Sequence, residues 1–410
     1  MAKQQRIYLD YAATTPIAPE VARAMAPYLS EKFGNPNSLH QYGQEARAAV
    51  DAARARAAEI LGLDPLAGFR EIIFTGSATE ANNLALRGVV RKALMDNAVP
   101  RPKVLISAGE HKSVRETALA LRAEGVEVAF IPLTTRGTVR LDALRQHIDE
   151  RTVLVSVMYV NNETGAVQPI EKIAAMVAAV RAEKKNGYPL FHTDAVQAFQ
   201  CFSCGPRELG VDMMTLSAHK LYGPKGVGLL YVRLAPTPHA RALGPRAVLA
   251  PLITGGGQEF GVRSGTENVA GIVGFVRALE LAAARRDKAR RHLGKLQQRF
   301  WERLRAAIPH LRRNGDAAGS PHILNITFPA VRAEELVLRL DLEGIAVSSG
   351  SACSSRAAEA SHVLEAMGLS HAQVLRSVRI SFGMPTTARE VDRAVRSITM
   401  IFSKKKGRSL

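Results

Sequence analysis

Short runs of apolar and β-branched residues alternate with longer segments of helical periodicity through much of the chain. Segments such as Gln44–Leu61, Thr79–Leu94 and Ile170–Lys185 have the helical pattern. The strand-like runs are Glu71–Thr75, Val104–Ser107, Val126–Pro132, Thr152–Val160, Leu190–Thr193 and Val227–Val232. This alternation predicts an α/β domain with a mostly parallel, buried sheet. Such a sheet places ligands beyond the carboxyl ends of its strands.

The C-terminal part of the chain has a different pattern. Ala282–Ala307 reads as one long, charged helix, which we interpret as a connector. Thr387 and Glu390 have the spacing of a capping box that opens a last helix. Between the long helix and this last helix lie three strand-like runs, Ile323–Phe328, Ile345–Ser348 and Val378–Phe382, and one helical segment, Ala333–Leu342. The pattern predicts a smaller α+β domain that begins near residue 262.

The composition is typical of a folded protein outside membranes. Hydrophobic residues make up 47% and charged residues 22% of the 410 positions, which excludes disorder for most of the length. No stretch reaches the ~18 uncharged apolar residues that a membrane-spanning helix needs. The first residues also lack the apolar core of a secretory signal. We therefore expect a soluble, cytoplasmic protein without membrane contact.

The chain is strongly basic, with 55 Lys and Arg against 37 Asp and Glu and a formal net charge of +18. This charge favours contact with polyanions or anionic substrates. The basic residues are nevertheless spread along the chain, and the one tight run is Lys404–Arg408. Aromatic residues, at 5%, are too few to indicate a base-stacking surface. We interpret the charge as a solvated basic surface and do not expect direct nucleic-acid binding.

A first candidate site is the turn after the strand at Glu71–Thr75. Its sequence, TGSATE at Thr75–Glu80, places small and hydroxyl residues between a strand and a helix. Backbone N–H groups and the helix dipole at such a turn favour an anion such as phosphate. The turn matches neither GxGxxG nor a Walker A motif, so a dinucleotide or nucleoside triphosphate is not indicated. An ordinary helix N-cap by Ser77 or Thr79 is the alternative interpretation.

Two further signals follow later strands. Asp194 ends the run LFHTD, and Lys220 stands in SAHKLYGPKG, a turn of small, aromatic and glycine residues. A lysine there can form a Schiff base with an aldehyde cofactor. Pyridoxal phosphate also needs an acidic partner for its ring nitrogen and a phosphate site. Each signal alone is also typical of a solvated lysine or a capping aspartate, but the three in this order indicate pyridoxal phosphate.

The three cysteines, Cys201, Cys204 and Cys353, are too few for a disulfide framework. Cys353 lies in SSGSACSSR, at Ser348–Arg356, among small polar residues that are typical of an exposed loop and not of a core. It is a candidate nucleophile, and a surface thiol without function is the alternative. Cys201 and Cys204 form one CxxC pair, at most half a zinc site. We therefore predict two incidental loop thiols and no metal site.

Many motifs in a fixed order resemble the cysteine desulfurases of the NifS/IscS-like branch, which belong to the class V aminotransferase family. The resemblance covers nearly the whole chain. SSGSAC together with the later VRISFG distinguishes this branch from relatives that share only the lysine and the aspartate. The motifs are YLDYAATTP, FGNPNSLH, GEHKSV, VNNETG, HTDAVQ, SAHKLYGPKG, GGGQEFGVRSGTEN, SSGSAC and VRISFG.

The resemblance implies the α/β fold of fold-type I pyridoxal-phosphate enzymes. A large domain, residues 16–262, would hold a mainly parallel seven-stranded sheet. A smaller α+β domain would combine residues 1–15 with 263–410 and carry the loop of the catalytic cysteine. The domains would meet at the cofactor.

The resemblance also implies roles for individual residues. Lys220 would hold pyridoxal 5'-phosphate and carry protons, Asp194 would pair with the ring nitrogen, and His111 would stack on the ring and assist proton transfer. The other contacts would be to the phenolic oxygen, from Asn162 and Gln197, and to the phosphate, from Ala78, Thr79, Ser217, His219 and, across a subunit boundary, Thr266.

The implied reaction converts L-cysteine to L-alanine. Arg379 would bind the substrate carboxylate in a bidentate way, with Asn35 and Asn162 nearby. The Cys353 thiolate would take the substrate sulfur as a persulfide. A homodimer with shared sites would pass this sulfur to an acceptor, either an iron–sulfur scaffold or a tRNA-thiolation enzyme.

The chain departs from the family pattern after the cysteine loop. Ala358–His362 (AEASH) lacks a proline that relatives carry, which should loosen the next helix start. Arg233–Val248 looks like an insertion. Two same-fold alternatives are a class V aminotransferase, which Cys353 disfavours, and a selenocysteine lyase. A nucleic-acid-binding protein on a degenerate fold would be expected to lack Lys220 or Asp194, and both are present.

Overall fold

The computed structural model describes the whole chain except residues 1–5, 67, 185, 236–241, 350–359 and 407–410. Its centre is one seven-stranded sheet in the order β2-β8-β7-β6-β5-β3-β4. Only β8 runs against its neighbours, so the sheet is mainly parallel, as predicted. The strands are β2 (Ile72–Thr75), β3 (Lys103–Ser107), β4 (Glu127–Ile131), β5 (Thr152–Ser156), β6 (Leu190–Asp194), β7 (Met213–Ser217) and β8 (Gly228–Val232).

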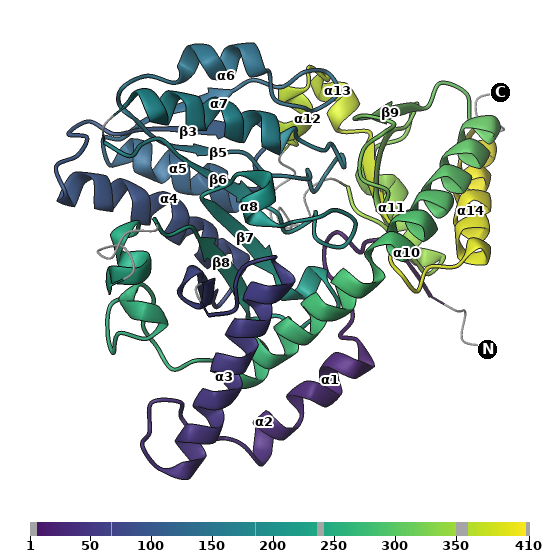
Figure 1. Ribbon diagram of the computed structural model, residues 1–410. Helices are drawn as coiled ribbons and strands as arrows, with labels where there is room; N and C mark the ends of the chain where they lie inside the picture. Colours follow the sequence, from purple (N-terminus) through teal and green to yellow (C-terminus); the bar gives the residue numbers. More distant parts are fainter. Residues whose placement is uncertain (1–5, 67, 185, 236–241, 350–359, 407–410) are drawn as a thin grey trace.

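Helices cover both faces of this sheet (Figure 1), and alternate residues of each strand contact opposite layers. Leu105 packs in the core of one face, whereas Val104 and Ile106 pack in the core of the other. Burial on both faces explains the uninterrupted apolar runs of these strands. The helices here are α1 (Pro19–Met25), α2 (Pro27–Ser30), α3 (Gln41–Ile60), α4 (Ala78–Met95), α5 (Lys112–Ala123), α6 (Leu141–His147), α7 (Ile170–Glu183) and α8 (Pro206–Leu209).

The connecting helix α10 (Val269–Ala307) begins well before the predicted Ala282. Its first half packs in the core of the sheet and its second half in a separate C-terminal core. The sequence pattern did not predict this earlier start, because Gly271 and Gly274 have low helix propensity and weaken the helical signal. Gly274 is required by close packing, since a Cβ there would lie 2.6 Å from Met25 of α1. Asn268 caps the helix by accepting from the Gly271 N–H at 3.0 Å.

The C-terminal core lies around an antiparallel sheet in the order β12-β10-β9, beside a parallel pair of β1 and β11. Thr387 and Glu390 form the predicted capping box, because each backbone N–H donates to the other's side chain. The domain boundary near residue 262 stays a prediction. The elements are β1 (Ile7–Tyr8), β9 (Arg312–Asn314), β10 (Ile323–Thr327), α11 (Ala333–Leu342), β11 (Ile345–Ala346), α12 (His362–Ala366), α13 (His371–Val374), β12 (Ser377–Ser381) and α14 (Ala388–Lys406).

None of the described helices is both long and apolar enough to cross a membrane. The start of α12 is held by Ser361, whose hydroxyl accepts from the Leu364 N–H at 3.2 Å and donates to Glu163 at 2.5 Å. These two bonds fix the helix start, which the sequence predicted to be loosened.

A buried ion pair anchors the glycine-rich segment before α10. The Arg54 guanidinium of α3 binds both carboxylate oxygens of Glu259, at 2.7 and 2.8 Å. The same guanidinium lies 4.9–5.5 Å from the ring centroids of Phe69, Phe74 and Phe260. Glu259 and Phe260 have φ of 48° and 58°, a backbone conformation that residues other than glycine rarely adopt. The pair holds this strained segment against the sheet.

Replacing Arg54 with Ala should leave the Glu259 carboxylate buried without its cation. We expect a loss of about 3–5 kcal/mol in the free energy of unfolding, measured as a lower thermal midpoint and a lower denaturant midpoint. Arg47→Ala is the matched control, because Arg47 lies on the same helix and its ion-paired side chain is 72% exposed. Equal midpoints for the two variants would contradict the anchoring role.

Candidate active site

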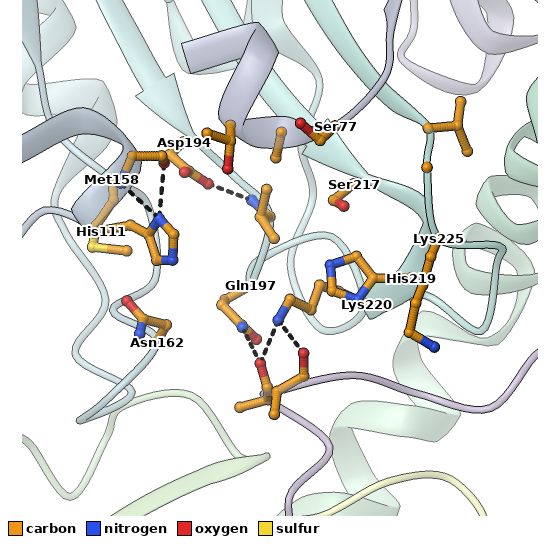
Figure 2. Close-up of a pocket in the computed structure, with 18 of the residues that line it drawn as sticks. Ser77, His111, Met158, Asn162, Asp194, Gln197, Ser217, His219, Lys220 and Lys225 are labelled. Carbon is orange, nitrogen blue, oxygen red and sulfur yellow. Dashed lines mark hydrogen bonds between the residues drawn. The ribbon is translucent and has the colours of Figure 1, made fainter. Parts of the chain in front are cut away.

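A cavity of about 350 Å³ lies beyond the carboxyl ends of the central strands, where the sheet meets the C-terminal part. Figure 2 shows its polar side chains converging from separate segments. It brings together most of the predicted site residues: Ala78, Thr79, His111, Asn162, Asp194, Gln197, Ser217, His219, Lys220 and Arg379.

The first turn of α4 forms one wall of the cavity. Ser77 caps this helix by accepting from the Glu80 N–H at 3.1 Å, so the N-cap interpretation is correct. The anion interpretation fits the same turn, because an 18-residue helix directs its N-terminus at the cavity, near Ser217 and His219. Gly228 allows β8 to approach this turn, since a Cβ there would lie 2.5 Å from the Ser77 carbonyl carbon.

Asp194 supplies the negative charge of the cavity from the end of β6. Its side chain is 5% exposed. One carboxylate oxygen accepts from the Val196 N–H at 3.0 Å and the other from Nδ2 of Asn82 at 2.8 Å. These donors hold the carboxylate in place beneath a ring-sized space, where it can pair with a protonated ring nitrogen.

Asn82 and Ser113, which the sequence pattern did not reveal, connect Asp194 to His111. Nδ2 of Asn82 also donates to the Ser113 hydroxyl at 2.8 Å, and this hydroxyl lies 2.8 Å from Nδ1 of His111. Asn82 is fully buried in α4, and a buried amide in a helix was the available signal. A continuous chain of hydrogen bonds therefore runs from the carboxylate to the imidazole.

This chain also determines where His111 carries its hydrogen. Nδ1 accepts from the Ser113 backbone N–H at 3.1 Å, so it bears no hydrogen of its own in the neutral ring. Burial lowers the pKa of His111 below its ordinary value, the Asp194 charge opposes this and the Lys220 charge adds to it. The neutral ring therefore carries its hydrogen on Nε2, which acts as a donor, while the lone pair of Nδ1 is used by the Ser113 groups.

Lys220 lies in a short turn, Ala218–Lys220, directly after β7. Its ammonium donates to the backbone carbonyls of Ala12 and Ala13, at 2.8 and 2.5 Å. Nε2 of Gln197 donates to the same Ala12 carbonyl at 2.9 Å. The dashed lines in Figure 2 show this arrangement. The N-terminal segment thus holds the lysine beside Gln197, within the cavity.

Arg379 enters the cavity from β12 and is 2% exposed. It donates to the Asp10 carboxylate at 2.7 Å and to the Asn162 carbonyl at 2.9 Å. Its Nε and the Oδ1 atom of Asn162 are buried without a hydrogen-bond partner among the described residues. Unpaired buried polar atoms are rare. Here the Nε–H can donate to a ligand carboxylate, and Oδ1 can accept from an N–H or O–H group of a ligand.

Two predicted contacts lie elsewhere. Asn35 was expected beside Asn162 and Arg379; in the single chain it is exposed and does not line this cavity, and its role stays a prediction. Thr266 is also exposed and outside the cavity. The loops that carry them meet, because Nδ2 of Asn37 donates to Glu267 at 3.3 Å. Cys353 lies outside the described residues.

The two thiols of the CxxC pair lie between helices and strands, and both are buried. Cys201 and Cys204 are 1% and 2% exposed, and burial raises the pKa of each thiol to about 12. Thiols with such pKa values are poor nucleophiles at neutral pH. No group of three or more His, Cys, Asp or Glu side chains that could hold a metal ion occurs in the part of the chain that the structure describes.

Comparisons with known proteins agree with this geometry. The profile of the family described as Aminotransferase class-V matches residues 7–394. The protein named cysteine desulfurase IscS from Dictyoglomus turgidum is 39% identical over 402 residues, which are 98% of this chain and 95% of that protein. A structure described as a NifS-like protein has a TM-score of 0.85 at 36% identity, over 97% of this chain and 100% of its own. A second, SspA in complex with cysteine, has a TM-score of 0.77 at 34% identity, over 92% and 99%.

Replacing Asn82 with Leu should remove one of the two described donors to Asp194 and disconnect His111. A hydrogen bond to a charged group contributes about 1.5–3 kcal/mol, so we expect roughly tenfold or greater weakening of pyridoxal phosphate binding. Equilibrium titration of the cofactor-free protein measures this. Asn83→Leu is the control, because Asn83 is only half-buried on the same helix and bonds only to the Thr79 carbonyl among the described groups. Unchanged affinity in Asn82→Leu would refute the supporting role of Asn82.

Proposed function

Because the chain belongs to the class V aminotransferase family, and within it to the NifS/IscS-like cysteine desulfurases, we propose that it converts L-cysteine to L-alanine and transfers the sulfur as a persulfide on Cys353. One observation carries this proposal most directly. Lys220, the Asp194 carboxylate and the N-terminus of α4 line a single cavity together with Arg379.

The cofactor is pyridoxal 5'-phosphate, and the residues present fit it. Lys220 would hold its aldehyde carbon, Asp194 would keep its ring nitrogen protonated, and the first turn of α4 would hold its phosphate. The unpaired Oδ1 of Asn162 supports a polar ligand at this place. When bound, the cofactor supplies an electron-accepting ring that makes the substrate Cα–H acidic and its sulfur transferable.

Arg379 and the cavity charges select the substrate. An amino acid carries a carboxylate that the guanidinium can bind, and Lys220 and Lys225 add positive charge to the same cavity. Asp10 holds Arg379 in position through one nitrogen, at 2.7 Å. Lys220 is the group that can take the proton from Cα and return it to the product, and the Nε2–H of His111 can assist by donating a hydrogen bond in the same cavity.

Cys353 performs the sulfur transfer. Its thiolate attacks the sulfur of the substrate, an S–S bond forms, and the C–S bond breaks. The electron pair of the broken bond stays with the three-carbon fragment, which takes up protons and leaves as L-alanine. The substrate sulfur remains on Cys353 as the terminal sulfur of a persulfide, so atoms and electrons balance without an external oxidant.

A homodimer with shared sites is part of the proposal. Large apolar side chains of α2, the following loop and the first turn of α3 are exposed to solvent in the single chain. They lie next to the meeting loops of Asn35 and Thr266, so both residues would serve the neighbouring subunit's site. The exposed residues are Leu29, Phe33, Leu39 and Tyr42.

The sulfur then passes to an acceptor protein, either an iron–sulfur scaffold or a tRNA-thiolation enzyme. This destination and the cytoplasmic location stay predictions from the sequence.

The visible spectrum tests the cofactor assignment. The purified protein should show an absorption band of lysine-bound cofactor and should form alanine and sulfide from L-cysteine. Lys220→Ala should lose that band and, by at least about three orders of magnitude, the activity. Lys225→Ala is the control, because Lys225 lines the same cavity and should keep the band. A band that persists unchanged in Lys220→Ala would exclude Lys220 as the cofactor lysine.

The role of Cys353 has its own test. Cys353→Ser should bind the cofactor with the wild-type spectrum but form no protein-bound persulfide, as detected by mass spectrometry after incubation with L-cysteine. Cys204→Ala is the matched control, because its buried thiol should leave persulfide formation intact. Wild-type sulfide release by Cys353→Ser would contradict the proposed transfer.

A further inference from the structure

A second buried histidine lies behind the cavity, where the C-terminal part meets the sheet. His322 directly precedes β10 and is 3% exposed. Its backbone carbonyl accepts from the Phe382 N–H at 2.9 Å, which fixes the residue against β12. One ring nitrogen, Nε2, lies 3.2 Å from Oε1 of Gln197, and the other, Nδ1, lies 2.7 Å from the Ser320 hydroxyl. The proposed reaction gives His322 no role.

The direction of each hydrogen bond in this group follows from one carbonyl. The Ala12 carbonyl only accepts, so the amide nitrogen of Gln197 must face it, and the amide oxygen must face His322. Nε2 of His322 therefore donates to this oxygen. Nδ1 is then the acceptor, and the Ser320 hydroxyl donates to it. The chain runs in one direction, from Ser320 through His322 and Gln197 to Ala12.

The Ala12 carbonyl also accepts from the ammonium of Lys220, at 2.8 Å. Ser320 is itself held in place, because its carbonyl accepts from Nε2 of Gln297 in α10 at 3.0 Å. The hydrogen-bond chain thus begins on a fixed residue of the C-terminal part and ends on the group that binds the lysine. A flip of the Gln197 amide would break both of its contacts at once.

We propose that His322 is a positioning residue: its Nε2–H holds the amide of Gln197 with the NH₂ group directed at Ala12 and the cofactor side of the cavity. The proposal rests on the proposed function, since Gln197 is there assigned to the phenolic oxygen of the cofactor. His322 touches neither the cavity nor Lys220 in the described contacts, so it acts only through Gln197.

The neutral state of His322 makes this role testable. Burial, with the charge of Arg379 as a smaller cause, lowers the pKa of His322 to about 4. The other facing group that titrates is Cys201, whose sulfur lies 3.9 Å from Nδ1 and whose pKa is raised to about 12. The ring is therefore uncharged between pH 6 and 9. Replacing the imidazole of His322 therefore removes a hydrogen-bond donor without changing the charge beside the cavity.

The expected effect concerns the protonation of the lysine-bound cofactor. An NH₂ group that donates to the phenolic oxygen lowers the negative charge there, and so weakens the hold of that oxygen on the neighbouring proton. When Gln197 loses its orientation, this proton is held more tightly. The pKa read from the visible absorption band of the loaded enzyme should therefore rise, by roughly half to one pH unit for one neutral hydrogen bond.

The experiment compares pH titrations of this band in the holoenzyme and four variants. His322→Leu removes the donor and should raise the spectral pKa. His322→Gln restores an N–H at nearly the position of Nε2 and should return the value close to that of the wild type. Ser320→Ala removes the donor to Nδ1, so the ring can move its hydrogen there, and should shift the value in the same direction as His322→Leu. Gln197→Leu should shift it at least as far.

Cys201→Ala is the matched control, because the Cys201 sulfur makes only a long contact of 3.9 Å with Nδ1, against 2.7 Å for the Ser320 hydroxyl, and its removal should leave the spectral pKa unchanged. Thermal unfolding of the cofactor-free proteins shows which variants fold. An unchanged value in folded His322→Leu, or an equal shift in His322→Gln, overturns the proposal. If His322→Leu does not fold, an unchanged value in Ser320→Ala does so.

A second measurement separates this proposal from the proposed function. If the wild-type protein shows no lysine-bound band, the function fails and the hydrogen-bond chain is still tested in the cofactor-free protein. There, ¹⁵N spectra of the histidine rings should place the hydrogen of His322 on Nε2 and move it, at least in part, to Nδ1 in Ser320→Ala. A hydrogen on Nδ1 in the wild type overturns the assignment.

Discussion

The N-terminal segment from Leu9 to Thr15 is the constraint on which the cavity depends. It lies between the sheet and the C-terminal part, and its backbone bonds to both. Leu9 donates to Ala346 and Ala12 donates to the Ser381 hydroxyl on one side, and Thr15 donates to the His219 carbonyl on the other. The carbonyls of Ala12 and Ala13 then bind Lys220. Without this segment the lysine would have neither its position nor its neighbours.

Polar groups in the cavity wall are oriented by chains of hydrogen bonds whose directions are fixed at one end. The Asp194 carboxylate can only accept hydrogen bonds, and this fixes the orientation of Asn82, Ser113 and His111 in turn. The Ala12 carbonyl can only accept, which sets Gln197 and His322. In a low-dielectric interior such chains are costly to break, because each break leaves a buried group unpaired. His111 and Gln197, the two side chains expected to act on the cofactor, are thus each oriented by a neighbouring side chain.

The positive charge of the cavity is balanced in a way that leaves room for an anionic ligand. Asp10 pairs with Arg379, and the charges of Asp194 and Lys220 act on His111 in opposite directions. The N-terminus of α4 adds a partial positive charge on the side of Ser217 and His219. These charges suit a doubly anionic phosphate near the N-terminus of α4 and a carboxylate near Arg379.

The sequence by itself determined the alternation of strands and helices and the mainly parallel sheet. It also indicated those candidate residues whose side-chain type is sufficient to suggest their chemistry. Apolar periodicity reports burial, and Lys220, Asp194 and the TGSATE turn each follow a strand, where ligands bind. It missed β7, whose five residues carry a weak strand signal, and the glycine-rich start of α10. Only the tertiary structure revealed Asn82, Ser113 and His322, and placed Asn35 outside the cavity. The reason is physical: local patterns encode whether a side chain is buried, whereas a hydrogen-bond partner 31 or 125 positions away is chosen by how the elements pack.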